Sequence, residues 1–157
     1  MATSVDYSGR TVDLLIFQGT QPSGMVQVSL GFGDAGYLTT GIQKVSQTFA
    51  LSFLMESGSV PDQRAYGTAF VTQFRLGYLR DESSVKAAFS FASDSVVRAM
   101  RIQAAQAGMP DDETIKSARL LSYSLDKGTG NLQLRVQITS EAGIARTVFL
   151  PIPVTIK

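Results

Sequence analysis

The chain of 157 residues contains no cysteine and no histidine. Without cysteine it can form no disulfide framework and offers no thiolate, and without histidine it lacks a common zinc ligand and a common catalytic base. Charged residues make up only 17% of the chain, and the 14 basic residues nearly balance the 13 acidic ones. These absences argue against most zinc sites, against thiol chemistry and against a surface built for polyanions, and we expect no cofactor.

Long apolar runs are also missing. No stretch approaches the roughly 20 apolar residues that cross a bilayer, and the start of the chain, MATSVD, lacks the basic segment and apolar core of an export signal. We therefore expect neither a membrane nor nucleic acid among the partners. The length suits one folded unit with a real hydrophobic core, and the low charge suits a surface that contacts other proteins.

Residues 118–153 carry the clearest pattern, which predicts three consecutive antiparallel strands joined by two tight connections. Apolar side chains occupy every second position of the first two runs, namely Leu121, Tyr123 and Leu125, then Leu132, Leu134, Val136 and Ile138. This period of two places one face of a sheet on a core and the other toward water. Glycine and short polar residues at 126–131 and 140–143 suit the two connections.

The third run of this meander, residues 144–150, leads into Pro151 and Pro153, which cannot donate a ladder hydrogen bond. We therefore predict an edge strand. An unpaired edge is a template for another chain, and the prolines blunt it only at its far end. The contact residues predicted there are Ala145, Arg146, Thr147, Val148 and Phe149. Loose strands between Thr11 and Leu30 are the other candidates for strand exchange.

Three helical segments precede the meander, and we expect them to cover its apolar face, which three strands cannot bury alone. The longest, residues 81–107, has apolar residues at intervals of three and four, Asp81 as N-cap and Gly108 as its stop. A second stripe starts at Thr40 and ends at Ser57-Gly58. A third, with Asp62 as its cap, has Tyr66, Ala69, Phe70 and Phe74 on one face.

The predicted fold is therefore α+β, with helices packed on one face of a C-terminal three-stranded antiparallel meander. Residues 38–157 form its core. Residues 1–37 form a strand-like arm with short strands at 11–17 and 25–30, which are candidates for a hairpin. Its glycines predict a part rich in loops.

The arm contains GFGDAG at residues 31–36, which matches the dinucleotide-binding fingerprint G-x-G-x-x-G, and Glu56 follows at a suitable distance. The fingerprint needs a buried parallel strand, a helix that begins within the motif and an acid at the end of the next strand. Here Gln27 and Ser29 make the strand half-polar, Thr39-Thr40-Gly41 delays the helix, and Glu56 falls in the last turn of a helix. We therefore interpret the motif as a glycine-rich loop.

Three short motifs resemble a known family. They are GIQKVSQ at residues 41–47, GSVP at 58–61 and YGT at 66–68. Their order and spacing, followed by a longer helix and a final meander, are similar to those of the baseplate wedge proteins of contractile-tailed phages called sheath initiators. The resemblance covers roughly residues 38–154. The family has Glu-Pro-Arg before the meander, and this chain keeps only the arginine, Arg119.

The resemblance implies structural work without a reaction. It implies a small subunit in many copies in the baseplate of the virion, assembled in the host cytoplasm, with other wedge proteins and the tail sheath as partners. The tail tube is a further candidate partner. Arg119, beside the acidic residues 111–113, is the contact residue that the resemblance implies. Another tail or neck component with the same fold is the alternative within this class.

Two functions of other classes are the alternatives, a glycoside hydrolase and a small-molecule binding module. Some members of the family carry a lysozyme-like label, and glycoside hydrolysis needs two carboxyl groups that face each other across a cleft. Glu56 with Asp62, or the acidic residues 111–113, are the candidates, but acids in a loop are usually solvated, and Asp62 suits a helix cap. A small-molecule binding module would need an apolar pocket, which no stretch demands. We expect no enzyme.

Overall fold

The computed structural model describes residues 10–11, 13–14, 38–61, 66–126, 128 and 130–153. The expected strand at 25–30, the glycine-rich residues 31–36 and the expected cap Asp62 lie outside this part of the chain.

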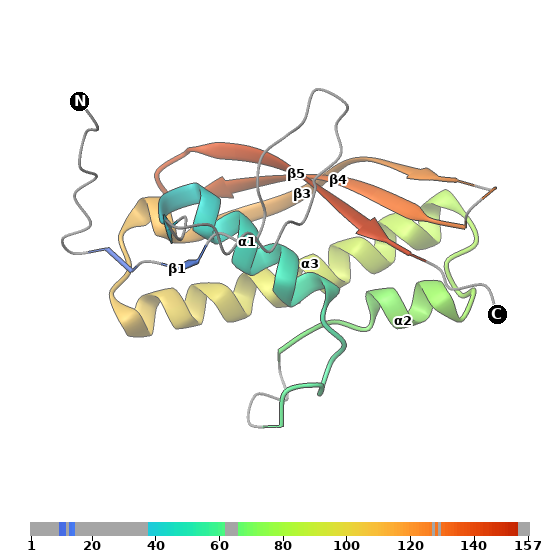
Figure 1. The fold of residues 1–157 in the computed structure, drawn as a ribbon, viewed down its shortest axis with the longest axis horizontal. Coiled ribbons are helices and arrows are strands. Elements are labelled where there is room, and N and C mark those ends of the chain that lie inside the picture. Colours follow the sequence, from blue (N-terminus) through green and yellow to red (C-terminus); the bar gives the residue numbers. More distant parts are fainter. Residues whose placement is uncertain are drawn as a thin grey trace, which may run out of the picture.

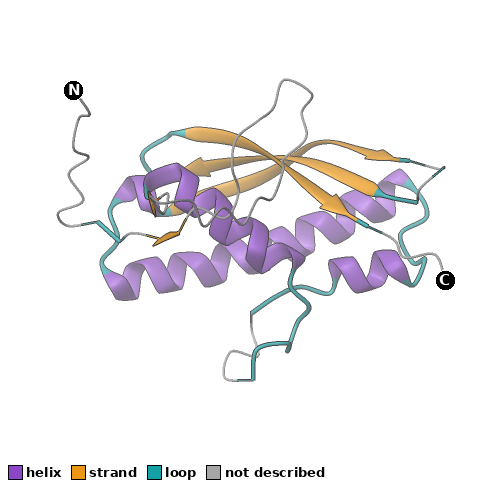
Figure 2. Cartoon of the chain, in the orientation of Figure 1, coloured by secondary structure: helices purple, strands orange, loops and turns teal. Residues whose placement is uncertain are grey.

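Helices and strands form two layers (Figure 1). The helices are α1, Gly41–Leu54, α2, Phe70–Arg75, and α3, Glu82–Ala107. The strands β3, Ile115–Leu125, β4, Leu132–Ser140, and β5, Ala145–Ile152, form an antiparallel sheet in the order β3-β4-β5. All three helices lie on one side of this sheet (Figure 2). The structure confirms the predicted α+β class and its C-terminal meander.

Strand β4 is the centre of the core. Its four alternating apolar residues, Leu132, Leu134, Val136 and Ile138, are each at most 1% exposed, as their period of two predicts. Beneath them the rings of Phe49 and Phe53 on α1 stack, and Phe53 also contacts Phe70 of α2 and Phe89 of α3. A β-strand with one polar face is thus covered by a helical layer that meets it through aromatic rings.

Helix α3 has the boundaries that its sequence predicts. The Asp81 carboxylate accepts a hydrogen bond from the backbone N–H of Ser84, and the backbone N–H of Asp81 donates to the Ser84 hydroxyl oxygen. These bonds satisfy donors that no helical carbonyl can reach. The Ser83 hydroxyl also donates to the Asp81 carboxylate, and the pKa of Asp81 is lowered first by the Ser84 N–H and then by this hydroxyl. Gly108 ends the helix in the left-handed region.

The two shorter helices differ from their predicted extents. α1 ends at Leu54, so Glu56 is not in its last turn; Glu56 instead forms an isolated parallel bridge with Thr68. α2 begins only at Phe70, because Thr68 donates its backbone N–H to Met55 and its hydroxyl to Phe53. These tertiary hydrogen bonds hold the chain before Phe70 extended, and a helical stripe cannot reveal them.

Strand β3 departs from the simple alternation that its sequence suggests. Its pairing with β4 slips between Leu120 and Ser122, and this bulge turns Leu121 out to 42% exposure. Tyr123 packs against the core as predicted, Leu120 does so in place of Leu121, and Leu125 is 49% exposed near the strand end. A bulge places two residues opposite one, so the apolar face moves by one residue across it.

The described part of the arm is short. Strand β1, Asp13–Leu14, pairs antiparallel with β2, Leu38–Thr39, immediately before α1. The strand predicted at 11–17 is therefore present only at these two residues within the described chain, and its partner there is β2.

Candidate functional site

The edge of β5 is the first candidate site. The turn between β4 and β5 determines which backbone groups of β5 bond to β4 and which point outward, a property called here the hydrogen-bond phase. At the β4–β5 turn the Ser140 N–H donates to the carbonyl of Ile144 at 2.9 Å. Thr139 lies opposite Ala145, and the register continues without a shift to Leu132 opposite Ile152. Hydrogen-bonded and non-hydrogen-bonded pairs alternate along an antiparallel ladder. Ala145, Thr147 and Phe149 therefore fall in non-hydrogen-bonded pairs, and their backbone N–H and C=O groups point away from β4.

The position of Pro151 agrees with this phase. Pro151 lies inside β5, opposite Gln133, at the same phase as Thr147 and Phe149. A proline there costs no bond to β4, because the missing N–H belongs to the outward row. β5 is also the outermost strand of the described sheet. The outward row therefore offers an uninterrupted set of donors and acceptors that ends at this proline.

The opposite edge of the sheet, β3, is less regular. Its register with β4 slips twice, between Ile115 and Ser117 and between Leu120 and Ser122. Bulges break the spacing of the backbone groups that an incoming strand would meet, and they are a common protection of exposed edges. Of the two edges in the described sheet, β5 is thus the one with an unbroken row.

The predicted contact residues of β5 divide into two sets. Ala145, Thr147 and Phe149 direct their backbone groups outward and their side chains to the outer sheet face, away from the helices. Arg146 and Val148 lie opposite Ile138 and Val136, so their side chains share the helix-facing side and their N–H groups face β4. On the outer face the Arg135 guanidinium lies 5.8 Å from the centre of the Phe149 ring, a cation–π contact.

Arg119 lies on β3, opposite Gln137, with an exposed side chain. It lines an open groove of about 240 Å³ between β3 and α3, which Lys86 and Asp94 also line. Within the described chain no ion pair involves Arg119, although the acidic residues 111–113 are close in sequence. Its guanidinium is therefore available to a partner, and the whole of β4 lies between Arg119 and the β5 row.

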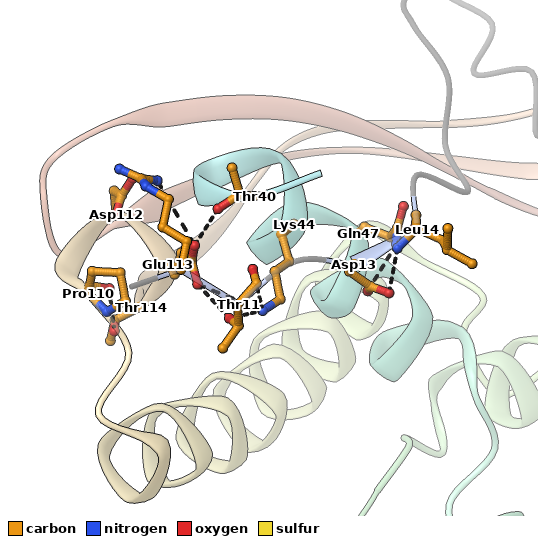
Figure 3. A network of polar contacts seen from close by, with 11 residues as sticks. Thr11, Asp13, Leu14, Thr40, Lys44, Gln47, Pro110, Asp112, Glu113 and Thr114 are labelled. Atoms are coloured by element: carbon orange, nitrogen blue, oxygen red, sulfur yellow. Dashed lines mark hydrogen bonds and ion pairs between the residues drawn. The ribbon is translucent and has the colours of Figure 1, made fainter. Parts of the chain in front are cut away.

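A second polar site surrounds Glu113, in the short 3-10 helix Asp111–Glu113 (Figure 3). Its carboxylate is buried, with the residue only 4% exposed. Thr11 donates its hydroxyl at 2.6 Å, the N-cap Thr40 donates a second hydroxyl, and Lys44 Nζ lies 3.8 Å away. The acidic loop was expected to be solvated. For Glu113 that expectation is wrong, because the N-terminus of α1 and the arm close over it.

Opposing effects act on the pKa of Glu113. Burial raises it, and the hydroxyls of Thr11 and Thr40, the Lys44 ammonium and the backbone N–H of Gly41 lower it; the net shift is downward. The carboxylate therefore stays charged and completes the N-terminus of α1, where a negative charge is favourable.

The arm is held to this site by polar contacts. Arg10 forms a 2.6 Å ion pair with Asp112, Lys44 donates to Thr11, and buried Gln47 donates its amide to the Leu14 carbonyl at 2.8 Å. Leu14 itself is 59% exposed. Sequence reasoning missed this network; the signal available was an acid three residues after Pro110, but nothing local showed that the arm returns to it.

The remaining carboxylate candidates stay apart from it. Glu56 is exposed and accepts a hydrogen bond from the Thr72 hydroxyl at 2.7 Å, and Asp62 lies outside the described residues. Among the described residues no group of acids could hold a metal ion. No described helix is long and apolar enough to cross a membrane.

Comparison with family models, curated proteins and solved structures finds no match for this chain.

Proposed function

We propose that this protein is a structural subunit of a phage contractile-tail baseplate, which joins wedge proteins and starts sheath polymerisation by pairing the edge of β5 with a strand of a neighbour. Two things support the proposal. One is the resemblance of residues 41–47, 58–61 and 66–68 to sheath initiators. The other, which carries the mechanism, is the unbroken row of outward backbone groups on Ala145, Thr147 and Phe149.

Strand addition gives affinity through main-chain hydrogen bonds, which the row provides without any rearrangement of the core. The neighbour is a sheath or wedge subunit, the site of action is the baseplate of the virion, and assembly takes place in the host cytoplasm. The outer sheet face adjoins the row, and Arg119 lies on the same face beyond β4, so a partner that adds a strand to β5 must also extend across β4 to reach the exposed guanidinium. No reaction is part of this function.

The test compares prolines at adjacent positions of β5. Thr147→Pro removes an outward N–H, and Pro151 occupies the same phase in the native strand, so the variant should keep its melting temperature. It should nevertheless fail to support sheath growth, seen as short or absent sheaths in electron micrographs. Val148→Pro removes an N–H that faces β4 and should lower the melting temperature clearly. Sheaths of normal length on a folded Thr147→Pro protein would rule this edge out.

A further inference from the structure

Arg146 stands out among the side chains of β5. Its neighbours on the helix-facing side of the strand are apolar, since Val148, Leu150 and Ile152 follow it at every second position. It lies opposite Ile138, which is fully buried. Arg146 is itself partly buried, and within the described chain it forms no ion pair. A charge on the inward side of an edge strand is a known obstacle to unwanted pairing.

We propose that Arg146 selects what pairs with the β5 edge: it rejects a second copy of this strand and admits an extended segment that places an acidic side chain beside it. This inference rests on the proposed use of the edge, and it names the chemistry of the partner.

Rejection of a second copy follows from the composition of β5. The strand reads ARTVFLPI and contains no carboxylate, so a second copy has nothing with which to neutralise Arg146. Consider two copies that pair antiparallel through their outward rows. With Thr147 opposite Thr147, the two guanidinium groups are diagonal neighbours; with Ala145 opposite Thr147, they face each other directly. Like charges in such cross-strand positions destabilise pairing. Other registers place Arg146 against Leu150 or Ile152 of the second copy, where its charge loses water without gaining a partner.

The preference for a partner strand with an acidic residue follows from the same geometry. A strand added to β5 places a side chain beside Arg146 on the helix-facing side at every compatible register. Aspartate or glutamate at that position forms a cross-strand ion pair, and the next inward position adjoins Val148, which favours a β-branched residue. The preferred partner is therefore an extended segment with alternating β-branched residues and one inward acid.

The first experiment measures self-association by sedimentation velocity over a wide range of concentration. The wild-type protein and Arg146→Lys should not self-associate through β5. Arg146→Val and Arg146→Gln should self-associate with rising concentration, and the double variants that add Thr147→Pro should not. Two neutral variants are used so that a folding defect in one leaves the test intact. Neutral variants that fold and behave like wild type would overturn the proposal, as would wild-type pairs that Thr147→Pro abolishes.

The second experiment measures partner choice with short capped peptides in which threonine alternates with valine around a central glutamate or lysine. The glutamate peptide should shift the amide resonances of Ala145, Thr147 and Phe149 and bind roughly fivefold more tightly than the lysine peptide, a ratio that Arg146→Val should remove. Equal binding of both peptides to the wild-type protein would overturn the selection by charge. These results are separate from the sheath test. Normal sheaths on Thr147→Pro particles would refute the proposed function, whereas equal binding of the glutamate and lysine peptides would refute only the role of Arg146.

Discussion

At the scale of single residues, the buried carboxylate of Glu113 joins segments that are far apart in the sequence. It joins the arm through Thr11, the start of α1 through Thr40 and Gly41, and the first turn of α1 through Lys44. Arg10, whose guanidinium lies 4.0 Å from the same carboxylate, pairs mainly with Asp112. Glu113 therefore contributes to holding the first described residues on the core, together with the Arg10–Asp112 ion pair and the bond from Gln47 to Leu14.

Glu113→Gln tests this role. The amide keeps the shape but loses the charge, so the Lys44 ammonium loses its partner and one of the donor hydroxyls meets an NH₂ group. We expect a loss of about 1–3 kcal/mol in the free energy of unfolding and faster amide exchange at Leu14 and Thr39. Asp111→Asn, an exposed acid in the same turn, is the matched control and should change neither. Unchanged exchange at both amides in Glu113→Gln would contradict the role.

The same carboxylate predicts a dependence on acid. Its pKa in the folded protein is lower than its ordinary value, so the unfolded chain binds the proton more readily. The stabilisation is therefore complete above the ordinary pKa of glutamate, about 4.3, and is lost as pH falls below it toward the folded pKa. Denaturant titrations between neutral and acidic pH should show a shallower loss of stability for Glu113→Gln than for wild type. Parallel curves would contradict the shift.

Leu134 tests the core at the same scale. It is 0% exposed at the centre of β4, between its cross-strand neighbours Tyr123 and Leu150. Leu134→Asp would bury an unpaired charge there, so we expect a loss of several kcal/mol, roughly 4 or more, and an unfolded or aggregated protein by circular dichroism. The exposed neighbour Gln133, changed to Asp, should be tolerated. A soluble Leu134→Asp protein with native melting temperature would refute this placement of the core.

At the scale of elements, local patterns describe long regular segments well and short ones poorly. α3 has caps at both ends and the predicted bounds, whereas α2 has six residues and begins later than its apolar stripe. The difference arises at Gly67 and Thr68, where the chain runs beside Met55 and Glu56. Tertiary contacts determine where the short helix α2 begins, whereas local propensity and capping determine the ends of the long helix α3.

Gly67 makes that close approach possible. Its φ is +94°, and a Cβ atom would lie 2.6 Å from the carbonyl oxygen of Glu56. Gly67→Ala should therefore cost about 2–4 kcal/mol, from backbone strain together with the backbone clash, measured by urea unfolding. Gly58→Ala is the matched control, since its φ is +81° but no atom lies within 4 Å of the added Cβ. It should cost only about 1 kcal/mol. Equal costs would show that the approach of residues 55–56 does not matter.

At the scale of the whole molecule, the important feature is that the helices cover only one face of the sheet (Figure 2). The other face carries Arg119 on β3, Arg135 on β4 and Phe149 on β5, and ends at the free row of β5. A monomer can keep such an antiparallel face in water, because its outward residues are mainly polar. Among the described residues, the arrangement leaves one broad surface and one edge without a covering helix or strand, which are the surfaces that the proposed assembly would use.

Arg119 allows a test of the proposed assembly at this scale. Because Arg119 is exposed and unpaired within the described chain, Arg119→Ala should leave the melting temperature unchanged and reduce incorporation into the particle, measured by quantitative blotting of purified tails. Arg98→Ala, an exposed arginine on α3, should affect neither. Incorporation of Arg119→Ala at the wild-type level would show that Arg119 is an ordinary surface residue.

The sequence by itself determined the α+β class, the buried face of β4, both ends of α3 and the edge position of β5, because periodicity, caps and prolines act within a few residues of one another. Only the tertiary structure decided the bulge that exposes Leu121, the outward phase of Thr147 and the burial of Glu113. Each of these depends on a partner distant in the sequence: β4 for the first two, and the arm with α1 for the third. The alternation of apolar and polar residues along a strand shows which side chains are buried, but not which backbone N–H groups face the neighbouring strand and which face outward. Likewise, the residues around an acid in a turn do not show which distant segment will bury it.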